Sequence, residues 1–230
     1  MELSLRDSAK LLNVSEKIVY RWAKQGDLPA YRVNEQYRFN RAELLEWATS
    51  RGINLSAEIL AEPSGTAVPV CLADAVRAGG VHHGVEGSEK SAVLHSAVAL
   101  MPLPREVDRD FVLHLLLARE SLGSTAIGRG IALPHARNPV VMHVPCPMIT
   151  VCFLKQPIEF DALDGQPVTT LFTMLSPTVR AHLHTLARLS HALQRPEFAE
   201  VISRRASCDE ILAACETIDH SLPSSPSVAV

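Results

Sequence analysis

The chain has 230 residues, 47% of them hydrophobic, and a formal net charge of -3 at pH 7. This length supports one or two domains with buried cores, and we expect two. The nearly balanced charge excludes nucleic-acid binding by the chain as a whole, so such a function must rest on a local surface. Five cysteines without a C-x-x-C pair give neither a zinc motif nor a secreted disulfide framework. Without a signal-peptide pattern or an apolar run of about 18 residues, we expect a cytoplasmic protein with no membrane insertion.

The first 52 residues are predicted to form a small domain of helices and one hairpin. Apolar spacing predicts a helix from Leu5 to Leu12 and a second from Ser15, as its N-cap, to Gln25. Residues 31–39 read as a hairpin with an Asn-led turn. Asn40 and Glu43 form an N-x-x-E capping pattern for a third helix.

This order of elements resembles the excisionase/MerR-like winged helix-turn-helix family, including a Leu-Pro-Ala before the hairpin and a Tyr-Arg-Phe within it. The resemblance implies that the second helix enters the major groove of duplex DNA and that the hairpin contacts its backbone. Because Glu35 lies at the hairpin turn, we expect modest non-specific affinity for DNA. The alternative is a helix-turn-helix used for protein contact or dimerisation. The predicted DNA-binding residues are Lys17, Tyr20, Arg21, Lys24 and Arg38.

The rest of the chain is predicted to comprise a linker at residues 53–68, a larger domain at 69–218 and a disordered tail at 219–230. In the larger domain, predicted helices alternate with short apolar runs of the length expected for buried strands. Helices are expected at 72–78, 88–100 and 106–120, near residue 182, after Pro196 and over 207–215. Strands are expected at 81–85, 131–133, 148–154 and 168–175.

A glycine-rich stretch precedes one histidine of this larger domain. Its glycines allow a loop to present backbone N–H groups to an anion, and two hydroxyl side chains add donors. A short apolar run follows, and Pro134 fixes the backbone just before His135. The predicted phosphate loop consists of Gly123, Ser124, Thr125, Gly128 and Gly130.

This stretch resembles the phosphorylation site of enzyme IIA domains of the bacterial phosphoenolpyruvate:sugar phosphotransferase system, of the mannitol/fructose type that includes the nitrogen-regulatory branch. The match extends to Arg119-Glu120, to the turn at 160–168 and to a helix that begins near His182, covering roughly residues 67–216. The resemblance implies an α/β fold in which a mixed β-sheet is flanked by helices. It also implies that His135 is the phosphoacceptor and that His182 is a supporting histidine hydrogen-bonded to it.

The chemistry of phosphoryl transfer agrees with these residue types. A neutral imidazole is a competent nucleophile near pH 7, and transfer needs compensation of the charge on the phosphoryl oxygens. Arg119 can grip two such oxygens, so we assign it as a phosphate clamp; the alternative is a helix-terminal cation favoured by the macrodipole. His182 and His184, two positions apart on a helix, point away from each other and cannot share a metal ion. We expect neither a metal nor a cofactor.

These patterns predict a DNA-binding transcriptional regulator whose enzyme IIA-like domain accepts a phosphoryl group on histidine, rather than a free-standing turnover enzyme. The resemblance implies an HPr-like phosphocarrier protein as donor, and we also expect a homodimer. One alternative is a phosphocarrier that passes phosphate to a sugar-transporter subunit and uses its N-terminal domain for assembly. The other alternative is a binding module that no longer accepts a phosphoryl group.

Overall fold

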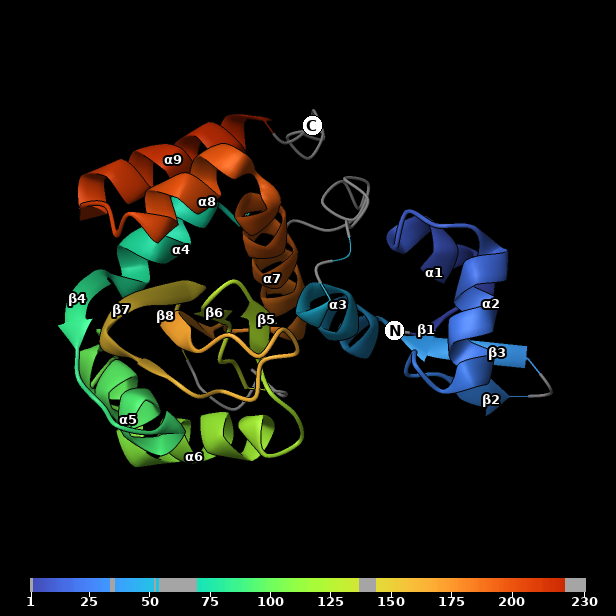
Figure 1. Ribbon diagram of the computed structural model, residues 1–230, viewed down its shortest axis with the longest axis horizontal. Helices are drawn as coiled ribbons and strands as arrows, with labels where there is room; N and C mark the ends of the chain where they lie inside the picture. The colour runs from blue at the N-terminus through green and yellow to red at the C-terminus, as the bar shows by residue number, and fades with distance from the viewer. Residues whose placement is uncertain (1, 34–35, 52, 54–69, 137–143, 222–230) are drawn as a thin grey trace.

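A computed structural model describes residues 2–33, 36–51, 53, 70–136 and 144–221 of the chain. These residues form two domains, and helix α3 (Arg41–Ser50) lies between them (Figure 1). Within the predicted linker only Ile53 is described, and residues 54–69 lie outside the described part of the chain.

The N-terminal domain contains the three predicted helices and the predicted hairpin. Its elements are β1 (Glu2–Leu3), α1 (Leu5–Leu11), α2 (Glu16–Gln25), β2 (Tyr31–Val33), β3 (Gln36–Asn40) and α3. The three strands form an antiparallel sheet in the order β1-β3-β2. Strand β1 was not predicted, because two residues are too few to show a periodic pattern. The predicted hairpin turn at 34–35 lies outside the described residues.

The ends of these helices follow from local capping. Ser4 and Asp7 form a capping box at α1, whereas Ser15 precedes α2 without a side-chain cap bond. Gly26 ends α2 with φ 78°, a left-handed conformation that glycine adopts without strain. Asn40 caps α3 by accepting a hydrogen bond of 2.9 Å from the Ala42 backbone N–H.

The C-terminal domain is built on a five-stranded mixed sheet in the order β4-β7-β8-β6-β5, which confirms the predicted fold class. Neighbouring strands alternate between parallel and antiparallel pairing across the sheet. The strands are β4 (Val81–Val85), β5 (Ala126–Gly128), β6 (Ile131–Ala132), β7 (Met148–Ile158) and β8 (Val168–Leu175). The helices are α4 (Leu72–Gly79), α5 (Lys90–Leu100), α6 (Arg109–Glu120), α7 (Val179–Gln194), α8 (Pro196–Ser203) and α9 (Cys208–Ser221).

Helices cover both faces of this sheet (Figure 1). Val151 and Phe153 of β7 join the core beneath α4, α7, α8 and α9, whereas Cys152 and Leu154 join the cluster that includes Val93 of α5. Successive strand residues point to opposite faces, so a strand that is covered on both sides reads as a continuous apolar run. None of the helices within the described residues is long and apolar enough to cross a membrane.

The predicted beginnings of two helices were wrong. Helix α5 begins at Lys90 after Glu89, not at Ser88. Helix α6 begins at Arg109, because the Asp108 side chain accepts hydrogen bonds from two backbone N–H groups of the first turn. Val112 and Leu116 of α6 are buried, whereas Phe111 is 41% exposed.

The C-terminal helix is longer than predicted. Helix α9 continues to Ser221, so residues 219–221 belong to a helix and not to the predicted tail. Asp219 explains the extension: its carboxylate accepts hydrogen bonds of 3.0 Å from the backbone N–H groups of Leu72 and Ala73, and it pairs with Arg188 at 2.7 Å. It therefore caps α4 and connects α4, α7 and α9. The predicted tail beyond Ser221 lies outside the described residues.

Helix α3 packs against both domains. On one side Trp47 donates a hydrogen bond of 2.6 Å to the Asp27 carbonyl of its own domain. On the other side α3 contacts α7 and β5, and one continuous hydrophobic cluster includes Leu44 of α3 together with Leu133 and Leu189 of the C-terminal domain. The two contacts together bury most of α3, including Leu44, Leu45 and Ala48.

Candidate functional site

His135 follows β6 and lies beside β8, where it forms a bridge with Met174. The backbone before it is held because the Pro134 carbonyl accepts a hydrogen bond of 2.9 Å from the Met174 N–H. Its ring Nδ1 lies 2.7 Å from the Leu133 carbonyl oxygen. A carbonyl oxygen only accepts, so Nδ1 is the donor in this bond and Nε2 is the nitrogen left to react. The residue is only 3% exposed.

His182 lies in the first turn of α7, which Thr178 caps by accepting a hydrogen bond from the Ala181 N–H. Its ring centroid is 5.2 Å from that of His135, so the structure brings the two predicted histidines together. Burial, assisted by the neighbouring Arg119 guanidinium, lowers the pKa of His182 to about 3. The ring is therefore neutral at pH 7. Nε2 of each ring is buried without a hydrogen-bond partner among the described residues, so the implied bond between them is not formed here.

Arg119 occupies the last turn of α6, as expected for a cation near a helix C-terminus. Its Nη1 donates a hydrogen bond of 2.9 Å to the Gly123 carbonyl, which orients the guanidinium. Nη2 lies 3.1 Å from a carboxylate oxygen of Glu46, and Nε is buried without a hydrogen-bond partner in the described part of the chain. Both interpretations of Arg119 agree with its position, because it ends a helix and also pairs with the carboxylate that lies next to His135.

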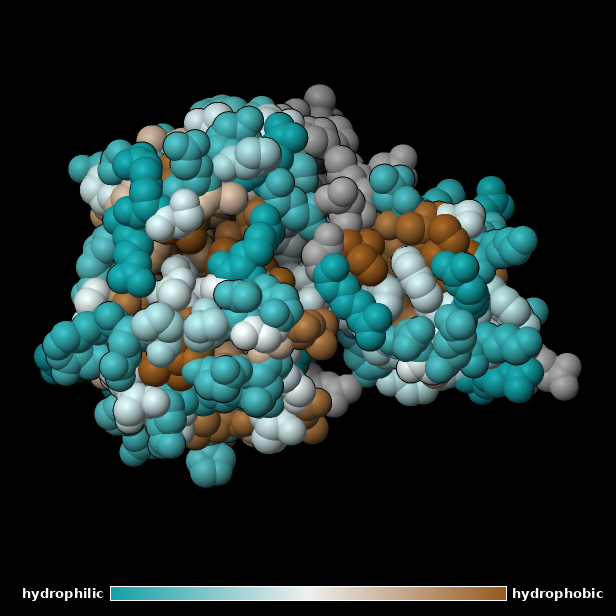
Figure 2. Space-filling view, viewed as in Figure 1, coloured by the Kyte–Doolittle hydropathy of each residue, from teal (hydrophilic) through white to brown (hydrophobic). Residues whose placement is uncertain are grey.

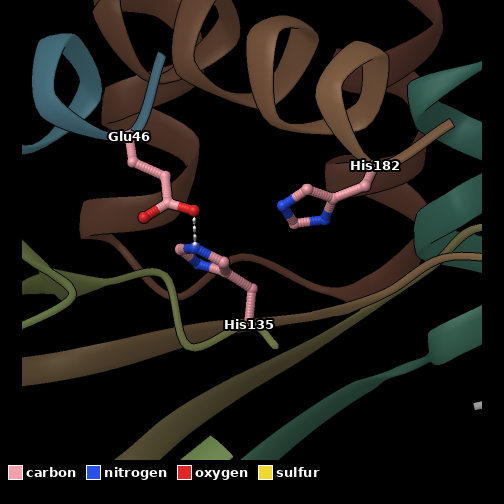
Figure 3. Close-up of side chains that lie close together, drawn as sticks. All are labelled: Glu46, His135 and His182. Atoms are coloured by element: carbon pink, nitrogen blue, oxygen red, sulfur yellow. Dashed lines mark ion pairs between the residues drawn. The ribbon is translucent and has the colours of Figure 1, made fainter. Parts of the chain in front are cut away.

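Glu46 of α3 is the site residue that the sequence interpretation missed. One of its carboxylate oxygens lies 3.3 Å from Nε2 of His135 (Figure 3). The other lies 3.1 Å from Nη2 of Arg119. Burial raises its pKa, but the contact with His135 and the positive charge of Arg119 outweigh burial and lower the pKa to about 2. The carboxylate is therefore ionised at neutral pH. The sequence feature that could have identified Glu46 is that it is a single acidic residue within the otherwise apolar run from Leu44 to Ala48.

Glu46, His135 and His182 also offer three potential metal ligands, whose donor atoms lie within 4.8 Å of one another. Two histidines and a carboxylate form a common catalytic zinc set. Zinc–ligand bonds of about 2.0–2.2 Å would require the donor atoms to approach roughly 3.4 Å. The guanidinium of Arg119 already neutralises the Glu46 carboxylate, so little negative charge is left to attract a metal cation. The observed arrangement therefore fits an anionic ligand better than a metal ion.

The predicted phosphate loop contacts Arg119 through the Gly123 carbonyl. The hydroxyl groups of the loop are bonded elsewhere. Ser124 donates to the Phe160 carbonyl. Thr125 donates through its hydroxyl, at 2.6 Å, and through its backbone N–H, at 3.1 Å, to the buried carboxylate of Glu120. These bonds hold the loop against α6, so neither hydroxyl is directed at His135.

The glycines of the same stretch form the turn between β5 and β6. Gly128 and Gly130 flank Arg129, and all three have positive φ values of 86°, 73° and 53° respectively. A Cβ atom on Gly128 would lie 2.8 Å from the Asp164 carboxylate, so a side chain does not fit there. The role of this loop as a phosphate cradle stays a prediction.

The predicted DNA-binding residues lie on the N-terminal domain, away from the histidine pocket. Those on α2, namely Lys17, Tyr20, Arg21 and Lys24, are exposed. Arg38 of β3 is half-buried and donates a hydrogen bond of 3.1 Å to the Gln36 side chain. The outer edge of this domain is largely hydrophilic in Figure 2. The α2 residues thus remain available to a partner while α3 contacts the C-terminal domain.

Comparisons with known proteins match both parts of the chain. The family model "Phosphoenolpyruvate-dependent sugar phosphotransferase system, EIIA 2" matches residues 76–217, and a helix-turn-helix domain model matches residues 2–52. A nitrogen regulatory protein of Pseudomonas aeruginosa is 39% identical over 117 residues, which cover 49% of this chain and 73% of that protein. The fructose-specific EIIABC component of Bacillus subtilis is 35% identical over 132 residues, covering 56% of this chain and 20% of that protein.

Solved structures agree with this assignment. The crystal structure of nitrogen regulatory protein IIA-Ntr from Neisseria meningitidis superimposes with a TM-score of 0.52 at 28% identity. The superposition covers 59% of this chain and 92% of that one. Both resemblances found in the sequence are thereby confirmed.

Proposed function

Because the chain belongs to the EIIA 2 family of the phosphoenolpyruvate-dependent sugar phosphotransferase system and carries a helix-turn-helix domain, we propose that it is a phosphorylation-responsive DNA-binding regulator. In this proposal His135 accepts a phosphoryl group from an HPr-like phosphocarrier protein. The N-terminal domain binds duplex DNA through α2 and the hairpin. The nitrogen regulatory relatives support a regulatory role rather than transport alone.

The observation on which the acceptor role depends is the orientation of the His135 ring. The bond from Nδ1 to the Leu133 carbonyl leaves Nε2 facing the pocket that contains Arg119 and His182. In the transfer step the Nε2 lone pair forms a bond to phosphorus while the bond between phosphorus and the donor histidine breaks. The donor ring keeps the released electron pair. Phosphate thus moves between two nitrogens, and no further reactant is required.

The neighbouring residues supply the charge compensation that this step needs. Among the described residues, Nε of Arg119 has no hydrogen-bond partner, and its Nη2 is held only by Glu46, so both groups can donate to phosphoryl oxygens once Glu46 leaves. His182 is neutral and adds one N–H donor without adding a negative charge. Removing the Glu46 carboxylate from the pocket would leave this set of donors free for an anion.

Incubation with phosphoenolpyruvate, enzyme I and HPr tests the acceptor role. We expect an acid-labile phosphoryl label that is absent from His135→Ala. The matched control is His95→Ala, which removes an exposed histidine of α5 and should be labelled like the wild type. A label that survives His135→Ala, or no label on the wild type, would contradict the proposal.

DNA binding is tested separately, by titration at two salt concentrations. The double variant Lys17→Ala with Arg21→Ala should weaken binding and reduce its salt dependence, because fewer counterions are released from DNA. Arg105→Ala with Lys155→Ala removes two exposed cations from the C-terminal domain and is the matched control. Equal affinity of the two double variants would contradict a DNA-binding role for α2.

A further inference from the structure

We propose that α3 is an internal ligand of the phosphoacceptor surface, with Glu46 at the position of the phosphoryl group, so that domain docking and phosphorylation of His135 exclude each other. The inference rests on the proposed function of His135. It adds a mechanism by which that site controls the N-terminal domain. The partner of the phosphoacceptor surface is thus a helix of the same chain.

The first argument is the place of the carboxylate. Glu46 contacts both groups that a phosphoryl group would contact. Its carboxylate lies 3.3 Å from Nε2 of His135 (Figure 3) and 3.1 Å from Nη2 of Arg119. A phosphoryl group bonded to Nε2 would place its own oxygens within that separation. Two anions would then compete for one guanidinium at close range, so one of them must leave.

The second argument is the extent of the interface around Glu46. The hydroxyl groups of Thr49 on α3 and Ser190 on α7 are both buried and lie 2.9 Å apart. Gln194 donates a hydrogen bond of 3.2 Å to the Ile53 carbonyl, just beyond α3. Apolar side chains of both domains join in one cluster. Docking of α3 is therefore a packed contact and not a single surface ion pair.

The third argument is access. The side chain of His135 is 4% exposed and that of Arg119 is 13% exposed with α3 in place. Phosphoryl transfer between two proteins requires the donor phosphohistidine to approach Nε2 in line. A buried ring beneath α3 does not permit this approach, so the docked state is closed to the carrier protein.

The regulatory consequence follows from linkage. Phosphorylation adds about -1.5 to -2 charges next to an ionised carboxylate, which favours release of α3. By reciprocity, whatever stabilises docking lowers the tendency of His135 to be phosphorylated, to the same extent. The cations of α2 are exposed in the docked state. Phosphorylation thus changes how firmly the DNA-binding domain is held, and it does not uncover α2.

A reversible covalent lock tests the exclusion directly. Thr49→Cys together with Ser190→Cys places two thiols where hydroxyl oxygens lie 2.9 Å apart, a separation suited to a disulfide after a small shift. In the full-length oxidised chain, labelling of His135 from phosphoenolpyruvate should fall at least tenfold, and reductant should restore it. Each single cysteine variant, oxidised in the same way, is the control. A locked chain that is labelled as fast as its reduced form would overturn the proposal.

A second variant tests the carboxylate itself. Glu46→Ala should raise the initial rate of His135 labelling severalfold, and Glu46→Gln should raise it less, because its side chain still fills the pocket. The control is Glu43→Gln on the same helix, whose carboxylate contacts the Tyr31 hydroxyl within the N-terminal domain. Equal rates for Glu46→Ala and the wild type would overturn the proposal.

Chemical modification separates this inference from the proposed function. Diethyl pyrocarbonate reacts with accessible histidine rings without any phosphotransferase protein. We expect faster modification of His135 in Glu46→Ala than in the wild type, and protection in the oxidised lock. If none of these chains accepts phosphate, the acceptor role fails, while the modification rates still report whether α3 covers the ring. Equal modification in all three would overturn docking.

Discussion

Glu46 and Arg119, 73 positions apart in the sequence, form an ion pair of 3.1 Å across the boundary between the two domains. The same carboxylate lies 3.3 Å from His135. An acid from the N-terminal domain thus occupies the pocket in which the C-terminal domain is proposed to bind a phosphoryl group. The two domains are therefore joined by a specific contact between site residues, and not only by the chain that links them.

The guanidinium of Arg119 is expected to be essential for phosphoryl transfer. Arg119→Ala should lower the initial rate of His135 labelling by about 10²-fold or more, because removal of a donor that stabilises developing charge typically has this effect. Arg119→Lys should recover part of the rate, since it restores the charge but not the grip on two oxygens. The rates are measured from phosphoenolpyruvate with saturating carrier protein. If Arg119→Ala were labelled as fast as the wild type, Arg119 would act only as a cation at the C-terminus of α6 and not in phosphoryl transfer.

His182 is expected to make the stability of the C-terminal domain depend on pH. Burial lowers its pKa to about 3 in the folded chain, whereas an exposed imidazole titrates near 6.5. Between these values the unfolded chain binds one more proton than the folded chain does. The free energy of unfolding should therefore fall as the pH drops from about 6.5 towards 3, by up to about 1.4 kcal/mol per pH unit from this residue.

Urea denaturation at several pH values measures this effect. His182→Gln should have a shallower dependence than the wild type between about pH 5 and 6.5. His191, whose pKa is also lowered by burial, is present in both chains, so its contribution cancels in the comparison. Parallel pH profiles of the two chains would show that His182 is not held neutral in the folded state.

Asp219 is expected to contribute more to stability than other acids of α9. Its carboxylate caps α4 and pairs with the buried Arg188, whose side chain is 9% exposed. Asp219→Ala should lower the free energy of unfolding by about 3–5 kcal/mol, because it leaves a buried cation unpaired. Glu216→Ala, on the same helix, breaks a pair in which both side chains are about half exposed, and should cost about 1 kcal/mol or less. Equal losses for both variants, measured by urea denaturation, would contradict the assigned role.

The sequence predicted elements well where the local signals were strong. Strand β8 has the predicted bounds, because a strand covered on both faces is a continuous apolar run. Asn40 correctly located the beginning of α3 through its capping chemistry, and α2 ends at the predicted Gln25, where Gly26 adopts the left-handed conformation. The beginning of α6 was misplaced because Pro104 and Asp108 both favour a helix start, and only the structure shows which of them forms the cap bonds.

The sequence predicted only those site residues that belong to the C-terminal domain. His135, His182 and Arg119 belong to one folded unit, and the family resemblance located all three. Glu46 belongs to the other domain, and its proximity depends on docking through Thr49 and Ser190. No spacing along the chain encodes such a contact, so it could not be read from periodicity or motif. The capping pattern ahead of Glu46 predicted a helix, but not what that helix packs against.

The most direct measurement is the position of the phosphoryl group on the ring of His135, determined by phosphorus NMR and mass spectrometry of the phosphorylated full-length chain. The contact between Nδ1 and the Leu133 carbonyl predicts one phosphoryl group per chain, bonded to Nε2 of His135. A phosphoryl group on Nδ1, on a different residue, or on none would contradict the pocket geometry, in which Nε2 faces Glu46 and Arg119.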